Sequence, residues 1–386
     1  MSDRSETVEM LAAAVRRFTR EVLLPAEAQV EAEEKIPDSI VRQLKELGLF
    51  GLCIPEEYGG LGLTPYEEAQ VVFEIGYASP VFRSYFGTSN GVGTLGLLID
   101  GTDEQRRKYL PRVASGELMT SFCLSEPNAG SDVASIATKA VREGDEYVIN
   151  GMKRFTTNSP LAGLFTVYAR TGPKEMGIDG ISAFLVEAGT PGLMVQKPHD
   201  KMGFRGNNVA DVIFEDCRVP ASTLLGGAEG IGFKTAMKAL DVARIHMSAV
   251  ATGLCDRLVD EGTRYALQRK QFGKPIADFQ LIQAMLADCS TEALASRAMV
   301  EKVAKMKEEG RNVTRESASC KYFTTEAVGR IADRVLQIHG GYGYIKAYPV
   351  ERLYRDVRIL RIYEGTSQIM QLIIAKQLLK EAASQL

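Results

Sequence analysis

The chain of 386 residues contains no tryptophan and only three histidines. His199, His246 and His339 are far apart in sequence, so their spacing gives no support for a metal site. The six cysteines are also widely scattered and form no C-x-x-C pair. Reduced thiols in a protein core are the simplest interpretation, and we expect neither a bound metal nor a disulfide framework.

The chain also lacks a surplus of either charge and any long apolar run. Its 46 Lys and Arg against 49 Asp and Glu give a net charge of −3. Proteins that bind nucleic acids usually carry a basic surplus or stripe, so we expect no such partner. No apolar run approaches the roughly 18 residues that span a bilayer, and the charged start, MSDRSETVEM, lacks the apolar core of a secretory signal. We expect a cytoplasmic protein without a membrane span.

The residues that are present predict three regions. Apolar residues recur at helical spacing in the first third, where Thr64 and Thr102 each begin a capping box. Short β-branched and aromatic runs follow between residues 147 and 214, with a hairpin turn at Gly144. Helical spacing returns after Gly230. We therefore expect an α+β multidomain protein, with an N-terminal helical bundle over 1–119, a central antiparallel β-sandwich or barrel over 120–235, and a C-terminal four-helix bundle over 236–386.

A single carboxylate near the C-terminus is a candidate catalytic group. Glu364 lies between Tyr363 and Gly365, directly before Thr366 and a periodic apolar run, which predicts the N-terminus of a helix. Gly365 would let another group approach the backbone closely. Two interpretations are open at this point, because a carboxylate here either complements the positive end of the helix dipole or acts as a catalytic base.

Four further stretches stand apart from the scaffold, each with an ordinary structural alternative. The turn Cys123–Asp132 is suited to the edge of a polar ligand or an anion, and is otherwise a surface turn. Gly151–Asn158 offers an aromatic face and hydroxyls, or is simply a strand. Arg269–Pro275 combines cations with an aromatic, as pyrophosphate and adenine require, or is a solvated helix end. Gln337–Tyr344 holds glycines for close approach, or for a tight turn.

Together and in this order, these stretches closely resemble the acyl-CoA dehydrogenase family over essentially the whole chain. The first and the fourth look like that family's two signature sequences, and the order of helical, β and helical regions agrees. The resemblance implies FAD-dependent α,β-dehydrogenation of an acyl-CoA thioester to a 2-enoyl-CoA, with electrons passed to an electron-transferring flavoprotein. It also implies a homotetramer, built as a dimer of dimers.

The resemblance assigns most of the motif residues to FAD. The flavin edge and isoalloxazine would be contacted by Cys123, Leu124, Ser125, Gly130, Ser131, Phe155, Thr156 and Thr157. Residues from the later motifs would hold the pyrophosphate and adenine of a neighbouring subunit's FAD, namely Arg269, Gln271, Phe272, Gln280, Gln337, Gly340 and Gly341. Thr366 and Gln368 would return to the cofactor. The family commonly has tryptophan where Phe155 stands.

The resemblance also assigns the substrate side. Glu364 corresponds to the general base, which takes the proton from Cα while the hydride from Cβ goes to flavin N5, and its backbone N–H would hold the thioester oxygen. Ala243 stands where other members carry their base, which supports Glu364 as the sole base. Further substrate contacts would come from Ser131, Asp241, Arg244, Gly365, Lys376 and Arg83.

Arg83 bears on the choice of substrate. The stretch Phe82–Tyr85 resembles the tripeptide by which glutaryl-CoA dehydrogenases place an arginine on a distal carboxylate. A short acyl chain with an anionic tail is one interpretation, and an ordinary surface arginine is the other. An acyl-CoA oxidase, a flavin-dependent acyl-CoA lyase and a non-enzymatic paralogue that binds CoA esters are alternatives for the whole chain.

Overall fold

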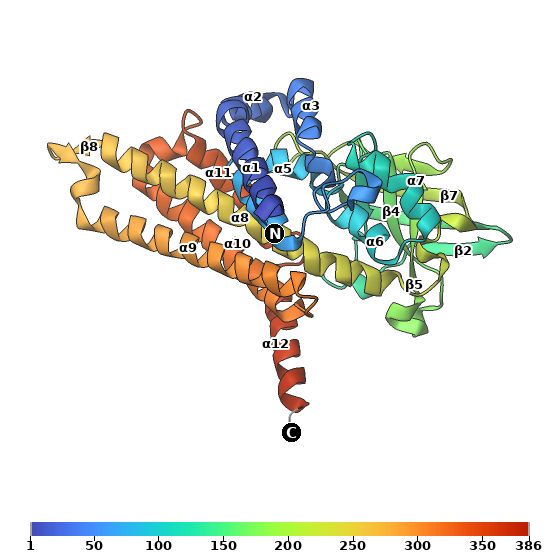
Figure 1. Ribbon diagram of the computed structural model, residues 1–386. Coiled ribbons are helices and arrows are strands. Elements are labelled where there is room, and N and C mark those ends of the chain that lie inside the picture. The colour runs from blue at the N-terminus through green and yellow to red at the C-terminus, as the bar shows by residue number, and fades with distance from the viewer. Residues whose placement is uncertain (1, 385–386) are drawn as a thin grey trace.

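The computed structural model describes residues 2–384, and its first region is helical (Figure 1). A π-helical turn, Thr19–Leu23, joins the first two helices. Both predicted capping boxes are present, since Thr64 and Thr102 each accept a hydrogen bond from the backbone three residues later. The helices are α1 (Ser2–Phe18), α2 (Leu24–Glu33), α3 (Asp38–Glu46), α4 (Pro65–Ile75), α5 (Pro80–Gly87), α6 (Val92–Asp100) and α7 (Asp103–Ala114).

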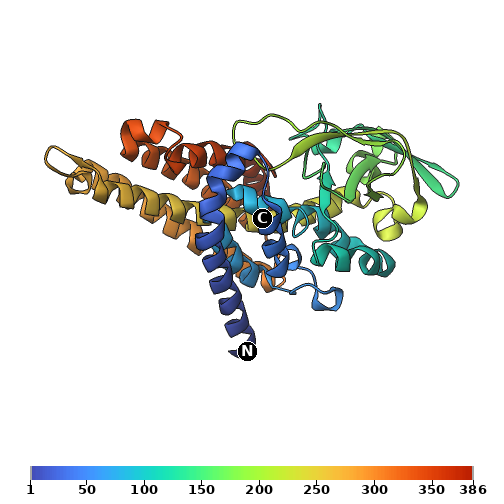
Figure 2. The ribbon, with the colours of Figure 1, turned by 90° about the horizontal axis from the view of Figure 1, so that it is seen from above.

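The central region is one curled sheet with the strand order β1-β4-β2-β3-β7-β6, and β5 pairs with β4 (Figure 2). The predicted hairpin turn at Gly144 is confirmed, because Glu143 pairs with Glu146 across it. Most pairings are antiparallel, but β4 runs parallel to β1 and to β2. The strands are β1 (Thr120–Cys123), β2 (Lys139–Glu143), β3 (Glu146–Thr157), β4 (Leu164–Arg170), β5 (Ile181–Glu187), β6 (Leu193–Val195) and β7 (Val209–Pro220).

Long helices make up the third region, so the predicted order of helical, β and helical regions is confirmed. A two-stranded hairpin, β8 (Lys270–Gln271) and β9 (Lys274–Pro275), projects from the bundle at the end opposite the sheet (Figure 1). The last helix extends away from the bundle (Figure 1). The helices are α8 (Gly232–Gln268), α9 (Gln280–Glu308), α10 (Thr314–His339), α11 (Pro349–Val357) and α12 (Ser367–Ala383).

The hydrophobic cores do not follow the three regions. One core joins the first helices to the bundle, with Leu44 and Phe82 in the same cluster as Leu254 and Val328. A second joins α6 and α7 to the sheet and to the start of α8. Because burial of apolar surface is the main stabilising contribution, the N-terminal helices depend on α8 for their own packing.

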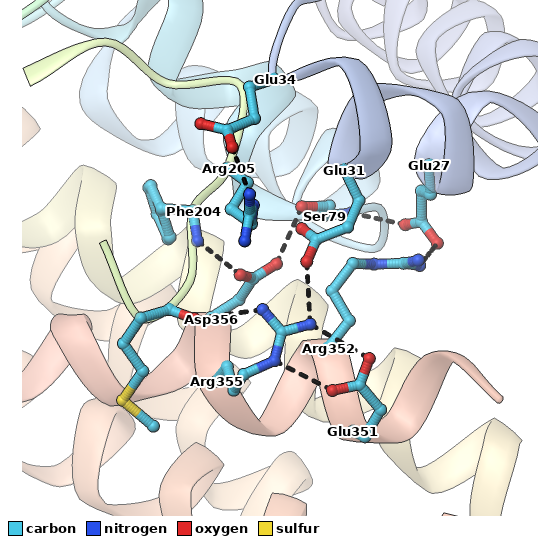
Figure 3. Close-up of polar contacts among 11 residues, drawn as sticks. Glu27, Glu31, Glu34, Ser79, Phe204, Arg205, Glu351, Arg352, Arg355 and Asp356 are labelled. Atoms are coloured by element: carbon cyan, nitrogen blue, oxygen red, sulfur yellow. Dashed lines mark hydrogen bonds and ion pairs between the residues drawn. The ribbon is translucent and has the colours of Figure 1, made fainter. Parts of the chain in front are cut away.

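A cluster of buried ions and hydrogen bonds joins all three regions, and we call it the domain clasp (Figure 3). Asp356 of α11 is at its centre and is 1% exposed. Its carboxylate accepts hydrogen bonds from the Phe204 N–H at 2.7 Å and from the Ser79 hydroxyl at 3.0 Å. Arg352 binds Glu27 of α2 from the same helix. The clasp thereby fixes the start of α5, which carries Arg83.

The structure contains no helix, within residues 2–384, that is both long and apolar enough to cross a membrane.

Candidate active site

Glu364 lies on a strained turn directly before α12. Its φ of +54° and the +97° of Gly365 place two consecutive residues in the left-handed region, which a non-glycine residue adopts at a cost of roughly 1–3 kcal/mol. Thr366 then caps α12, because its hydroxyl accepts a hydrogen bond from the Ile369 N–H at 3.2 Å. The predicted helix start is confirmed. Strain of this kind persists where surrounding contacts fix the backbone, and it often marks a functional site.

One oxygen of the Glu364 carboxylate is enclosed by protein. The residue as a whole is half-buried, but Oε2 is shut off from solvent and has no hydrogen-bond partner within the described chain. Burial raises the pKa of this carboxyl above its usual value, and Arg83, Lys321 and Arg244 counteract that rise. A carboxyl whose pKa is raised by burial is typical of a general base or acid.

Of the two interpretations of Arg83, the one that makes it an ordinary surface residue is wrong. The side chain is 6% exposed and lies in α5, where Nη1 contacts the sulfur of Met247 at 3.1 Å. Its Nε has no partner among the described residues. The hydroxyl of Tyr363 reaches the same sulfur at 3.4 Å, so Arg83 and the Glu364 turn share a contact. Sequence spacing could not show this burial, because α5 is covered by segments distant in the chain.

Asp241 and Arg244 lie one turn apart on α8 and form an ion pair of 2.8 Å. Arg244 is 4% exposed, and burial lowers the pKa of its guanidinium. A Cβ added to Gly365 would lie 3.8 Å from Arg244 Nη2, which brings this predicted pair to the turn of Glu364. The same helix turn carries Ala243, which is buried and offers no ionisable group.

The first stretch that was expected to contact flavin is anchored by a buried ion pair that sequence reasoning missed. Lys153 of β3 is fully buried and contacts Glu126 at 2.7 Å and the Leu124 carbonyl at 3.1 Å. Burial lowers the pKa of the lysine, although the carboxylate opposes this. Ser125 accepts the Arg154 N–H at 2.8 Å, so the turn is fastened along β3. A lysine within a strand pattern, with a glutamate in the adjoining turn, was the available signal.

The residues of this stretch differ in accessibility. Cys123 is wholly buried, so neither its side chain nor its backbone is open to a ligand. A Cβ added to the exposed Gly130 would meet nothing within 4 Å, and Ser131 is exposed beside it. Phe155, at φ +57°, is 62% exposed, which is unusual for so large an apolar side chain. Together these residues leave an open face on the sheet.

Neighbouring residues at the end of β3 are held in place. Thr156 is buried and its hydroxyl has no partner in the described chain, while Thr157 is half-buried. Asn158, which was also missed, donates to the carbonyls of Ser84 and Tyr85 at 3.0 Å each. It therefore ties the end of β3 to the helix that carries Arg83.

A second group of predicted residues lines one cavity at the β8 end of the bundle. The cavity has a volume of about 370 Å³, and its walls include Tyr265, Arg269, Gln271, Gly340 and Gly341. A Cβ added to either glycine would meet nothing within 4 Å. Phe272, at the tip of the hairpin, is 92% exposed. Gln280 and Gln337 are exposed near this end.

The sheet, which carries the first group of predicted flavin contacts, and the β8 hairpin beside the cavity lie at opposite ends of α8 (Figures 1 and 2). This helix has 37 residues and is therefore roughly 55 Å long, at a rise of 1.5 Å per residue. Glu364 is not among the described residues that line this cavity. The predicted residues Gln368 and Lys376 are exposed on α12.

Comparison with known proteins adds the family. The three family domains that match are acyl-CoA dehydrogenase, N-terminal domain, over residues 5–117, middle domain, over 121–217, and C-terminal domain, over 230–379. The chain belongs to the acyl-CoA dehydrogenase family. Members of this family are oxidoreductases that act on CH–CH groups, so the predicted enzyme class is confirmed.

Individual members of the acyl-CoA dehydrogenase family match over nearly the full chain. Acryloyl-CoA reductase (NADH) of Anaerotignum propionicum is 42% identical, and the matched region covers 96% of this chain and 94% of the reductase. The caffeyl-CoA reductase-Etf complex subunit CarC of Acetobacterium woodii is 39% identical, over 98% of this chain and 99% of its own. A glutaryl-coenzyme A dehydrogenase solved with glutaryl-CoA superposes with a TM-score of 0.91 at 34% identity, covering 97% and 95% of the two chains.

Proposed function

We propose that the protein is an FAD-dependent acyl-CoA dehydrogenase in which Glu364 is the catalytic base. The observation that carries this proposal is the enclosed carboxylate of Glu364, which has no partner at Oε2 and lies on a strained turn. A carboxylate with only a structural role would be expected to accept hydrogen bonds from nearby donors. Three buried cations around it keep the ionised form accessible in spite of burial.

The residues present fit FAD. Gly130, Gly340 and Gly341 all face open space that a larger residue would fill, and Phe155 and Phe272 expose aromatic faces. Arg269 lines the cavity with Gln271, which suits a pyrophosphate. When bound, the flavin would accept the hydride that leaves Cβ of the acyl chain.

Glu364 would carry out two tasks for the thioester. Its carboxylate would remove the proton from Cα, a step for which a well-placed base contributes about 10²–10⁴-fold. Its backbone N–H has no acceptor within residues 2–384, so it is available to hydrogen-bond the thioester oxygen as negative charge develops there. Asp241 and Arg244 would contact the substrate beside this turn.

The separation of the two flavin half-sites supports an oligomer. Because they lie at opposite ends of α8, one cofactor would draw its isoalloxazine contacts from one subunit and its pyrophosphate contacts from another. Exposed leucines on α9 and α12, including Leu281, Leu294 and Leu379, offer apolar surface for the contact with a second copy. We propose a homotetramer arranged as a dimer of dimers.

Arg83 favours a short acyl chain with an anionic tail. A buried guanidinium without a carboxylate partner is costly, and a ligand carboxylate would satisfy it. The shared thioether contact at Met247 places Arg83 next to Tyr363 and therefore near the base.

The names of the relatives support a proposal for the electron acceptor. The Acetobacterium woodii protein is named as part of an Etf complex, and we propose an electron-transferring flavoprotein as the partner here. Two relatives are named as reductases of unsaturated acyl-CoA compounds. The same base and the same C–H bonds serve either direction, and the partner's redox potential decides between them.

We propose a cytoplasmic location.

A single experiment tests this proposal. The purified protein is examined for a flavin spectrum and then mixed without oxygen with butyryl-, glutaryl- and succinyl-CoA. Bleaching of the flavin by at least one thioester is expected, with glutaryl-CoA the most effective. A protein without flavin, or one that no thioester bleaches, would overturn the proposal. Rapid re-oxidation of the bleached protein by oxygen would identify an oxidase instead.

A further inference from the structure

Lys321 of α10 is one of the three buried cations around Glu364, and it has so far been given no role of its own. Its side chain is fully buried, and its ammonium donates a hydrogen bond to the carbonyl oxygen of Gly365. No carboxylate within the described chain forms an ion pair with it at 4 Å or less. Because burying an unpaired charge is costly, the retained ammonium requires an explanation in function or in local structure.

We propose that Lys321 is a positioning residue for the catalytic base: its ammonium holds the Gly365 carbonyl, and with it the strained turn, and supplies a fixed positive charge beside Glu364. This inference rests on the proposed role of Glu364 as the base. It assigns to Lys321 no contact with the substrate.

The mechanical part follows from the backbone. The turn has positive φ at both Glu364 and Gly365, and such a backbone persists where outside contacts hold it. A Cβ at Gly365 would lie 2.5 Å from Met370, so the turn is also packed tightly against α12. Thr366 fixes the helix side of the turn through its cap. Lys321 fixes the opposite side, from a helix separated by 44 residues.

The electrostatic part follows from the other cations. Arg244 is paired with Asp241 at 2.8 Å, and Arg83 belongs to the proposed acyl-tail site. Arg83 has the largest effect of the three cations on the pKa of Glu364, and Lys321 the second largest. Glu326 and Arg244 also act on the pKa of Lys321. Burial lowers the pKa of Lys321 to about 8, so the ammonium remains mostly charged at neutral pH. Tyr363 is the remaining ionisable group beside the base, and burial keeps its pKa well above the usual range.

The test compares three variants. Lys321→Met removes both the charge and the donor, Lys321→Gln keeps an N–H donor without charge, and Lys321→Arg keeps the charge. The protonation of Glu364 is followed by the infrared carboxyl band, taken as the difference between each protein and its Glu364→Gln counterpart. An opposite charge within about 4–6 Å shifts a pKa by roughly 1–3 units. We expect the midpoint to rise by about 1 unit in the Met and Gln variants and to stay in place in the Arg variant.

The second measurement is the rate of flavin bleaching at saturating thioester on the pH plateau. Lys321→Met is expected to lose about 10-fold or more, because a misplaced base costs up to about 10²-fold, while Lys321→Gln retains more of the rate than Met. An unchanged midpoint in both uncharged variants, or the same shift in the Arg variant, would overturn the proposal. If the Met variant does not fold, the Gln and Arg variants carry the comparison.

The infrared titration needs no substrate. A protein that no thioester bleaches would therefore overturn the proposed dehydrogenase function, while the midpoint comparison would still decide the link between Lys321 and Glu364.

Discussion

The carboxylate of Asp356 accepts a hydrogen bond from the backbone N–H of Phe204, at 2.7 Å, across a sequence separation of 152 residues. The ring of Phe204 in turn packs edge-on against the ring of Tyr363, with centroids 6.3 Å apart. Because Tyr363 directly precedes Glu364, the loop of the β-domain that contains Phe204 supports the Glu364 turn. The second oxygen of Asp356 accepts the Ser79 hydroxyl at the start of α5, so one carboxylate supports the segments of both Arg83 and Glu364.

The stability of the protein should depend on pH through Asp356. Burial raises the pKa of this carboxyl from 3.8 to about 6. A raised pKa means that the folded state binds more protons than the unfolded state, so this contribution to stability is present below about pH 4 and is lost as the pH rises through 6. Two units correspond to roughly 3 kcal/mol. As the pH rises from 4.5 to 7.5, the free energy of unfolding should therefore fall less in the Asp356→Asn protein than in the parent.

The free energy of unfolding by urea, measured at both pH values, checks this expectation. Asp333→Asn, at an exposed position of α10, is the control and should follow the parent. Equal pH dependence in the parent and the Asp356→Asn protein would contradict it.

Replacing Glu364, the proposed base, should lower the activity of the protein and raise its stability. Glu364→Gln should reduce the rate of flavin bleaching by about 10²–10⁴-fold, while flavin content stays the same. Because burial raises the pKa of Glu364, its ionised form costs stability, and that cost grows as the pH rises through the folded pKa. The variant should therefore melt at a higher temperature than the parent at pH 8. Glu9→Gln, on the exposed face of α1, is the matched control. A Glu364→Gln protein that bleaches at the parent rate would rule out this residue as the base.

Arg83 should discriminate between substrates by the charge of the acyl tail. Removing one partner of a buried ion pair costs about 3–5 kcal/mol, which corresponds to roughly 10²–10³-fold or more in kcat/KM. Arg83→Ala should lose this factor with glutaryl-CoA and much less with butyryl-CoA. Arg42→Ala, at an exposed position, should treat both substrates as the parent does. Equal losses with the two thioesters would remove the anionic tail from the proposal.

Complementation should reveal whether each flavin site is shared between subunits. Gly341→Leu fills the open space of the cavity and should prevent flavin binding without strain, because a Cβ there meets nothing within 4 Å. Glu364→Gln binds flavin but lacks the base. In a mixed dimer, one of the two sites would combine the intact base of the first chain with the intact cavity of the second.

Co-expression of these two inactive variants under separate affinity tags should therefore restore activity in the doubly purified oligomer. Gly341→Ala, which is small enough for the cavity, should retain flavin on its own. An inactive mixed oligomer with both chains present would show that each site is complete within a single subunit.

Several features could be predicted from the sequence because they depend on neighbours within a few positions. The caps at Thr64, Thr102 and Thr366 satisfy backbone N–H groups three residues away, and the turn at Gly144 joins adjacent strands. The order of helical and β regions follows from periodicity in the same way. The motifs also singled out Glu364, and in the structure one oxygen of its carboxylate is buried without a hydrogen-bond partner in the described chain.

Other features were decided by the tertiary structure alone. Periodicity shows which face of a helix is buried, but it does not show what covers that face. The burial of Arg83 depends on the packing of α5 against α8, which the sequence does not show. Lys321 and Lys153 are buried in a similar way, and their partners lie 44 and 27 residues away. A buried charge is stable only where such distant groups converge on it. The sequence was enough to identify the family and to single out Glu364 as the candidate base. The charges that surround Glu364 could not be found in this way, because they come from α5, α8 and α10 and meet only in the folded chain.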